Sequence, residues 1–172
     1  EQRLAARQFR EADELTRQAF AQVVAGTSSW SEVETAIAQF SCQDLRHINR
    51  FWQDASNGKF GIMGQAELWH QLKANPNQAT SLAAYQTFTE QIGWASLGEQ
   101  PWDYRHRILE ELTFDLSAPR GHLPALGVWG VGRWPEGVMG PPPGAPIDIG
   151  GWDVVASRAT EWWKRAQICQ RS

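Results

Sequence analysis

The sequence predicts an all-α fold, a helical domain with one long Gly/Pro-rich loop near its C-terminus. Apolar residues recur with the 3.6-residue period of amphipathic helices through most of the chain. Alternating β-branched runs, which are typical of strands, are nearly absent. Residues 127–151 depart from the helical period, and their glycines and prolines indicate a loop. A chain of 172 residues is long enough for one domain with a buried core.

The first expected helix covers Leu4–Val24, where Phe9 and Phe20 belong to a regular apolar stripe. A Gly-Thr-Ser-Ser run then stops it. A short second helix is expected over Trp30–Ala38, with Ser31 as a candidate N-cap.

The third expected helix, Gln43–Ala55, is strongly amphipathic. Ser41 offers a capping box with Asp44, three residues further on. The helix ends where Asn57 or Gly58 can adopt the left-handed C-cap conformation. Its apolar face holds Leu45, Ile48 and Trp52, and its other faces hold Asp44, Arg46, Asn49, Arg50 and Gln53.

Three more helices are expected, over Gly64–Leu72, Ser81–Ile92 and Asp153–Gln170. Gly98–Arg107 is expected to be loop and turn, and Leu109–Leu116 fits either a helix or a short extended piece. The residues predicted to share a core, or to line the floor of a cup, are Leu45, Ile48, Trp52, Phe60 and Trp69.

Composition excludes several classes of protein. The net charge of −3 argues against a nucleic-acid partner. No apolar run approaches the length of a membrane helix. Cys42 and Cys169 lie far apart and fit no metal-binding spacing, so reduced thiols in a cytosolic-type compartment are the default expectation. Because Glu1 is not an initiator methionine, the chain is expected to be a fragment, a mature form or a trimmed one.

No catalytic motif stands out. The chain has no dinucleotide fingerprint, no phosphate-binding loop, no His-Glu-x-x-His and no nucleophile elbow. Adjacent carboxylates such as Asp13 and Glu14 diverge on a helix and make poor acid–base pairs. The sequence therefore predicts a protein that is not an enzyme.

Five segments, in order along the chain, resemble the Genomes Uncoupled Four family, the porphyrin-binding regulators of magnesium chelatase in oxygenic phototrophs. The most specific is Ser56–Gly61 followed by Gln65 and Trp69. The family usually has an aromatic residue followed by Ser-Val where this chain has Ile62-Met63-Gly64. The other four segments are Phe9–Thr16, Phe40–Trp52, Ile92–Trp94 and Phe114–Pro124.

The resemblance implies an all-helical cupped hand whose concave face and flanking loops hold a tetrapyrrole. It divides the single domain into a family-like core (1–125), a Gly/Pro/Trp loop (126–151) and a C-terminal helix (152–172). The implied ligand is a porphyrin, either protoporphyrin IX or Mg-protoporphyrin IX, and the implied partner is a magnesium chelatase subunit. The implied location is the chloroplast stroma, the thylakoid surface with peripheral membrane association, or the cyanobacterial cytoplasm.

A porphyrin is a flat apolar disc with propionates on one edge, so its site needs aromatic walls and guanidinium groups at the rim. His122 has two interpretations: a histidine whose bonds to local backbone fix a turn, or an axial ligand or proton donor to the bound molecule. The loop 127–151 is expected to become ordered on binding. The predicted contacts are Phe60, Met63, Phe114, Arg120, His122, Trp129, Arg133, Trp134 and Met139.

The alternative is a helical sensory or interaction module that binds a protein partner or a linear bilin. Ten tryptophans, some of them expected at the surface, and the Pro141–Pro143 run suit such contacts.

Overall fold

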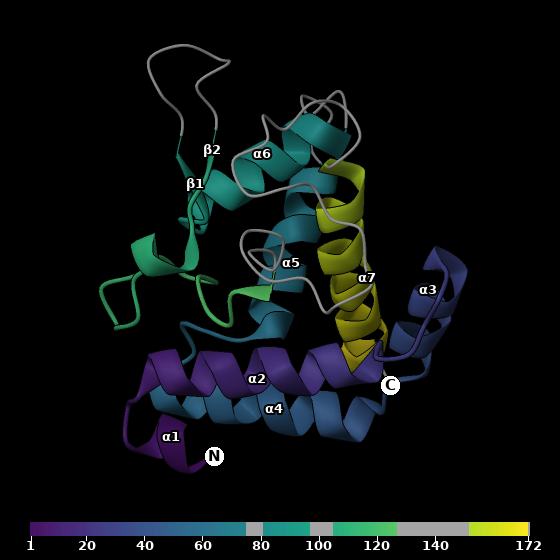
Figure 1. The fold of residues 1–172 in the computed structure, drawn as a ribbon. Helices are drawn as coiled ribbons and strands as arrows, with labels where there is room; N and C mark the ends of the chain where they lie inside the picture. Colours follow the sequence, from purple (N-terminus) through teal and green to yellow (C-terminus); the bar gives the residue numbers. More distant parts are fainter. Residues whose placement is uncertain (75–80, 97–104, 127–151, 172) are drawn as a thin grey trace.

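The computed structural model describes residues 1–74, 81–96, 105–126 and 152–171 (Figure 1). Within these ranges the regular elements are helices, apart from one antiparallel pair of two-residue strands, which confirms the predicted all-α class. The elements in order are α1 (Gln2–Ala5), α2 (Phe9–Val23), α3 (Trp30–Gln39), α4 (Cys42–Ser56), α5 (Ile62–Lys73), α6 (Ser81–Gln91), β1 (Ala95–Ser96), β2 (Arg105–His106), the 3-10 turn η2 (Leu109–Glu111) and α7 (Trp152–Arg171).

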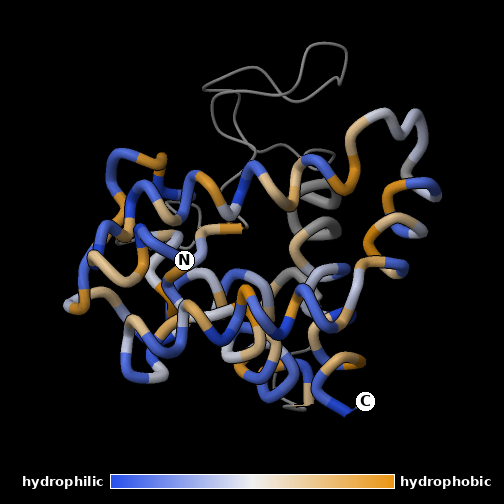
Figure 2. The backbone as a smooth tube through the Cα atoms, turned by 90° about the horizontal axis from the view of Figure 1, so that it is seen from below, coloured by the Kyte–Doolittle hydropathy of each residue, from blue (hydrophilic) through white to orange (hydrophobic). Residues whose placement is uncertain are grey.

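The helices form two layers that cross each other in Figure 1. Helices α2 and α4 lie side by side at the base, and the indole N–H of Trp52 on α4 donates to the hydroxyl of Thr16 on α2 at 3.1 Å. Helices α5 and α7 pack against each other and rise from this base, α6 packs on α5, and α3 packs on α7. Viewed from below, hydrophilic and hydrophobic residues alternate along the base helices, as amphipathic packing requires (Figure 2).

The prediction of one helix over Leu4–Val24 is wrong, because the chain breaks between α1 and α2. Arg7 adopts a left-handed conformation with φ 54°. This turn lets both Leu4 and Phe9 bury their side chains, at 6% and 3% exposure. Hydrophobic burial on both sides of the break outweighs the strain of one non-glycine residue at positive φ.

The helix caps are partly as predicted. Ser41 caps α4 by accepting from the backbone N–H of Asp44 at 3.3 Å, and Asn57 ends that helix at φ 54°. The cap of α3, however, is Ser29 rather than Ser31: its hydroxyl accepts from the N–H of Glu32. The Glu32 carboxylate in turn accepts from the backbone N–H of Ser28 at 2.6 Å, which extends the capped turn by one residue.

Helix α5 begins at Ile62 because α4 supplies its cap. The side-chain oxygen of Asn49 accepts from the N–H of Met63 at 3.0 Å, and Asn49 is only 3% exposed. The prediction that Asn49 lies on a polar face of its helix is therefore wrong. Gly61 has φ 128°, and a Cβ there would lie 2.6 Å from the Asn49 oxygen, so this approach requires glycine.

Aromatic rings pack together at several places in the core. In the base, Phe9, Trp52 and Phe60 pack with ring centroids 5.6–6.4 Å apart. In the upper layer, Trp163 lies 5.2 Å from Trp69 and 4.4 Å from Phe88. The described tryptophan side chains are Trp52, Trp69, Trp94, Trp162 and Trp163, and all are buried. The predicted shared core is confirmed: Leu45, Trp52, Phe60 and Trp69 are buried in one cluster, with Ile48 packed against it.

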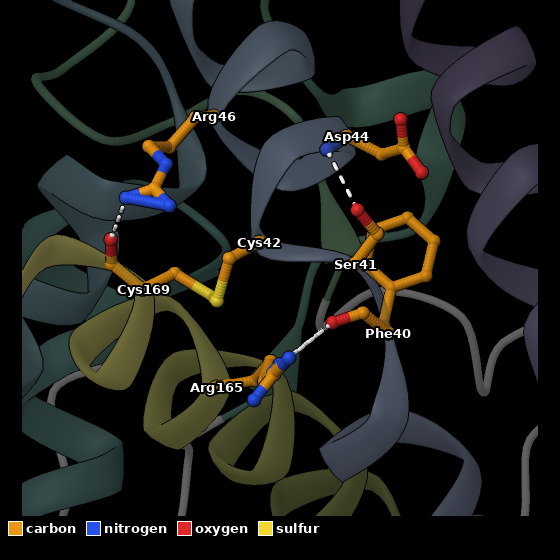
Figure 3. The surroundings of a disulfide bond; sticks show 7 residues. All are labelled: Phe40, Ser41, Cys42, Asp44, Arg46, Arg165 and Cys169. Atoms are coloured by element: carbon orange, nitrogen blue, oxygen red, sulfur yellow. Dashed lines mark hydrogen bonds between the residues drawn. A yellow bond between two sulfur atoms is a disulfide. The ribbon is translucent and has the colours of Figure 1, made fainter. Parts of the chain in front are cut away.

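Cys42 and Cys169 form a disulfide, so the expectation of reduced thiols is wrong (Figure 3). Their Cα atoms are 5.1 Å apart although 127 positions separate them in sequence. Cys42 is the first residue of α4 and Cys169 lies in the last turn of α7. The antiparallel return of the C-terminal helix to the base brings them together, and no local sequence pattern encodes that return.

We expect Trp52→Ala to lower the free energy of unfolding by roughly 3–5 kcal/mol, because it opens a cavity beside Phe9 and Phe60 and removes the bond to Thr16. Urea denaturation measures this cost. Leu15→Ala is the matched control, since Leu15 on α2 is 55% exposed and should cost less than about 0.5 kcal/mol. Equal effects of the two substitutions would contradict the placement of Trp52.

Candidate functional site

Residues 116–126, here called the clamped segment, have no helix or strand of their own, yet most of their second half is buried. Buried backbone without regular structure needs hydrogen-bond partners from elsewhere. Lys59 supplies two: its ammonium donates to the carbonyl of Leu116 at 2.6 Å, and its own carbonyl accepts from the N–H of Gly121 at 2.9 Å. The loop between α4 and α5 therefore binds the segment at two points.

The side chain of Gln65 joins three parts of the chain. It is fully buried, and its amide nitrogen donates to the carbonyls of Gly121 and Pro124 at 2.9 and 2.7 Å. Its oxygen accepts from the indole N–H of Trp163 on α7 at 3.3 Å. Helix α5 thus fixes both the clamped segment and the C-terminal helix through one amide.

Asp13 fixes the far end of the clamped segment. One carboxylate oxygen accepts from the N–H of Ala125 at 2.6 Å, and the other accepts from the guanidinium of Arg17 at 2.9 Å. Burial raises the pKa of Asp13, and these two donors oppose that rise. The sequence marked Asp13 only as one of two adjacent acids; its place in the family-like first segment was the signal of a buried role.

His122 is buried, and both of its ring nitrogens bind backbone. Its Nε2 accepts from the N–H of Thr113 at 3.1 Å, so Nδ1 carries the proton and donates to the carbonyl of Ile92 at 2.5 Å. Its own carbonyl accepts from the indole of Trp94 at 2.7 Å. This is the turn-fixing arrangement, and it leaves no ring lone pair for a metal ion. Contact between His122 and a ligand stays a prediction.

Phe114 is partly buried, and the exposed guanidinium of Arg10 lies 4.5 Å above its ring. This pairing places an aromatic face and a cation together beside the start of the clamped segment. Sequence reasoning selected Phe114 but missed Arg10, although Arg10 directly follows the first residue of the Phe9–Thr16 segment.

Arg120 projects from the clamped segment into solvent, 58% exposed, and its guanidinium pairs with the carboxylate of Glu67 on α5 at 2.9 Å. An exposed ion pair of this kind is worth little. The guanidinium can therefore change partner at small cost, for instance to a carboxylate on a ligand.

Phe60 and Met63 lie at the start of α5, against the same segment, because the N–H of Gly61 donates to the carbonyl of Leu123 at 2.9 Å. Phe60 is 1% exposed and Met63 is 9% exposed, so both are buried in the packing against the clamped segment. Five predicted contacts thus lie around one junction: Phe60, Met63, Phe114, Arg120 and His122. The other four, Trp129, Arg133, Trp134 and Met139, fall outside the described residues.

Burial favours the neutral form of two histidines, His106 on β2 and His122 in the clamped segment. Burial lowers the pKa of His106 on β2 to about 4, and burial also lowers the pKa of His122. Beside them, the hydrogen bonds from Arg105 and from the N–H of Ile108 lower the pKa of Glu111 to about 2.

In the described ranges, no three His, Cys, Asp or Glu side chains gather as a metal site would require. Among the helices that the structure describes, none is both long and apolar enough to cross a membrane.

Comparison with known proteins identifies what this arrangement is similar to. A family model described as GUN4-like matches residues 1–140. A Ycf53-like protein of Synechocystis sp. is 33% identical over 125 residues, which cover 72% of this chain and 48% of that protein. The chloroplastic tetrapyrrole-binding protein of Arabidopsis thaliana is 29% identical over 134 residues, covering 72% and 46%. The chain thus spans about half the length of these curated relatives.

The fold has a solved counterpart. The ligand-free structure of Arabidopsis thaliana GUN4 superposes with a TM-score of 0.54 at 24% identity, covering 96% of this chain and 86% of that one. At this identity the likeness establishes the fold alone.

We expect Gln65→Leu to lower the free energy of unfolding by about 2–5 kcal/mol, because it leaves the buried carbonyl of Gly121 without a donor and that of Pro124 with the N–H of Leu126 alone. Gln71→Leu is the matched control, an exposed glutamine on the same helix. Chemical denaturation of both variants measures the difference. A Gln65→Leu variant as stable as the control would refute the role of this amide.

The histidine pKa values predict a loss of stability in mild acid. The folded pKa of His106, about 4, lies below its ordinary value of 6.5, so the folded state prefers the neutral ring. This contribution is complete above about pH 6.5 and is lost as the pH falls towards 4, by up to about 3 kcal/mol. The denaturant concentration at the unfolding midpoint should therefore decrease as the pH is lowered from 7 to 4.5. The decrease should be smaller in His106→Gln and in His122→Gln. Parallel pH profiles for all three proteins would contradict the assignment.

Proposed function

The chain belongs to the GUN4-like family, and we propose that it is a non-catalytic protein that binds a porphyrin, protoporphyrin IX or its magnesium form. One observation carries the proposal. The family-like segments meet in a rigid junction around the clamped segment, and the sequence continues from that junction directly into residues 127–151, with their tryptophans and arginine. A firm base that is followed in sequence by aromatic and basic residues suits a large planar ligand.

The described part of the junction supplies chemistry of the right kind. The ring of Phe114 can stack on a porphyrin, and the guanidinium beside it, Arg10, suits a propionate. Arg120 offers a second guanidinium whose present bond is weak. Phe60, Met63 and His122 hold the floor and the turn, and Trp129, Arg133, Trp134 and Met139 complete the proposed set of ligand contacts.

The family supports a proposal for the role in the cell. We propose that the porphyrin-bound protein stimulates or regulates magnesium chelatase in chlorophyll biosynthesis by contact with one of its subunits. The relatives are a cyanobacterial protein and a chloroplastic one, so the proposed compartment is a cyanobacterial cytoplasm or a chloroplast, at the stroma or the thylakoid surface.

Titration of the purified protein with protoporphyrin IX tests the proposal, with tryptophan quenching and the Soret band as readouts. We expect a dissociation constant in the micromolar range or below, which corresponds to a standard free energy of binding of about −8 kcal/mol or more favourable. No change in either signal at tens of micromolar ligand would overturn porphyrin binding and favour the interaction-module alternative. A shift with a linear bilin but not with protoporphyrin IX would change the ligand class.

Arginine variants test how the propionates are bound. Arg133→Ala and Arg10→Ala should each raise the dissociation constant of the free-acid porphyrin roughly tenfold, because a charge-assisted bond is lost. They should have much less effect on the dimethyl ester, which cannot form that bond. Trp134→Ala should weaken both ligands equally, since it removes apolar contact area from either one. Arg50→Ala is the matched control, an exposed arginine on α4 paired with Asp54. Equal loss of free acid and ester in the arginine variants would contradict the assigned contacts.

A further inference from the structure

We propose that the Cys42–Cys169 disulfide is a redox-controlled tether: a protein dithiol reduces it, the last turn of α7 is released from α4, and porphyrin affinity falls. The link to affinity rests on the proposed function; the reducibility and the release do not.

The surroundings of the disulfide favour thiol exchange (Figure 3). Cys42 is partly exposed, whereas Cys169 is fully buried, so a thiol reaches Cys42 first. Cys42 is also the first residue of the 15-residue helix α4, whose N-terminus stabilises the Cys42 thiolate that leaves in the second step of the exchange.

Two guanidinium groups flank the disulfide. That of Arg46 donates to the carbonyl of Cys169 at 2.9 Å, and that of Arg165 donates to the carbonyl of Phe40 at 2.8 Å, two residues before Cys42. The carboxylate of Asp44, the nearest acid on α4, points away from the sulfur atoms in Figure 3. The local charge therefore stabilises a departing thiolate.

The exchange balances as an ordinary dithiol reaction. The thiolate of a Cys-x-x-Cys protein attacks the sulfur of Cys42, and the bond to Cys169 breaks, so Cys169 leaves as a thiolate and takes a proton from water. The second thiol of the reductant then displaces Cys42 and closes the reductant's own disulfide. Two electrons pass from the reductant to this chain.

The released turn adjoins the proposed ligand site. Gln170, next to Cys169, donates to the carbonyl of Met63 at 3.4 Å. Met63 is in the first turn of α5, which the clamped segment covers. Freeing the end of α7 removes a support from this turn, so the junction becomes less ordered and binding must restore that order.

The experiment compares the oxidised protein with protein reduced by dithiothreitol or by a thioredoxin-class dithiol protein. Maleimide labelling and mass spectrometry count free thiols in the native state. Hydrogen exchange follows 166–171 and 60–64, and protoporphyrin IX titration gives the dissociation constant. We expect two free thiols, faster exchange in both stretches and a dissociation constant raised roughly fivefold or more.

Two variants complete the design. The double variant Cys42→Ser/Cys169→Ser should behave like the reduced protein whether or not dithiothreitol is present. Arg46→Gln, which keeps the disulfide but removes one flanking charge, should slow its reduction by the dithiol protein.

The outcomes separate the claims. A disulfide that resists the dithiol until the protein is denatured would overturn the proposal, as would reduction with unchanged exchange and unchanged affinity. Faster exchange with unchanged affinity would overturn the regulatory half. An oxidised protein that binds no protoporphyrin IX would overturn the proposed function, while thiol counts and exchange would still judge the tether.

Discussion

The buried amide of Gln65 is the contact on which the arrangement of the chain depends. A neutral amide offers two N–H donors and one acceptor, and here it meets two carbonyls from the clamped segment and the indole N–H of Trp163. A carboxylate of the same size would face those carbonyls without donors, and an apolar side chain would leave the Gly121 carbonyl unsatisfied and the Pro124 carbonyl with the N–H of Leu126 alone. Because Gln65 is fully buried, each unmade bond would cost more than it would at the surface.

The residues that carry the family resemblance mostly build this scaffold. Asp13, Lys59 and Gln65 bind the clamped segment from three directions, and His122 fixes its turn through both ring nitrogens. Few of these groups remain available to a ligand. The chemistry that can meet a ligand lies at the edges instead, in the guanidinium above Phe114 and in the exposed pair of Arg120.

The helices and the core could be predicted because both follow from a local period. Trp52, four positions from Ile48 and seven from Leu45 on α4, shares their apolar face and is buried. Asn49 could not be placed, since its burial depends on α5 needing a cap from another helix. The disulfide could not be predicted from the sequence for the same reason, because Cys42 and Cys169 meet only where α7 packs against the base. Tertiary partners decide such residues, and periodicity carries no information about them.

Helix α7 is attached in two physically different ways. In its middle, Trp162 packs on Phe20 and Trp163 packs on Phe88, with ring centroids 4.2 and 4.4 Å apart. Such apolar contacts do not respond to redox state. At its end, the attachment is the disulfide, with hydrogen bonds from Arg46 to the carbonyl of Cys169 and from Gln170 to the carbonyl of Met63. Cutting the covalent link therefore leaves the helix docked and confines the change to its last turn. Local release of this type costs far less than global unfolding, and this difference is what lets a fold carry a regulatory element without risking its core.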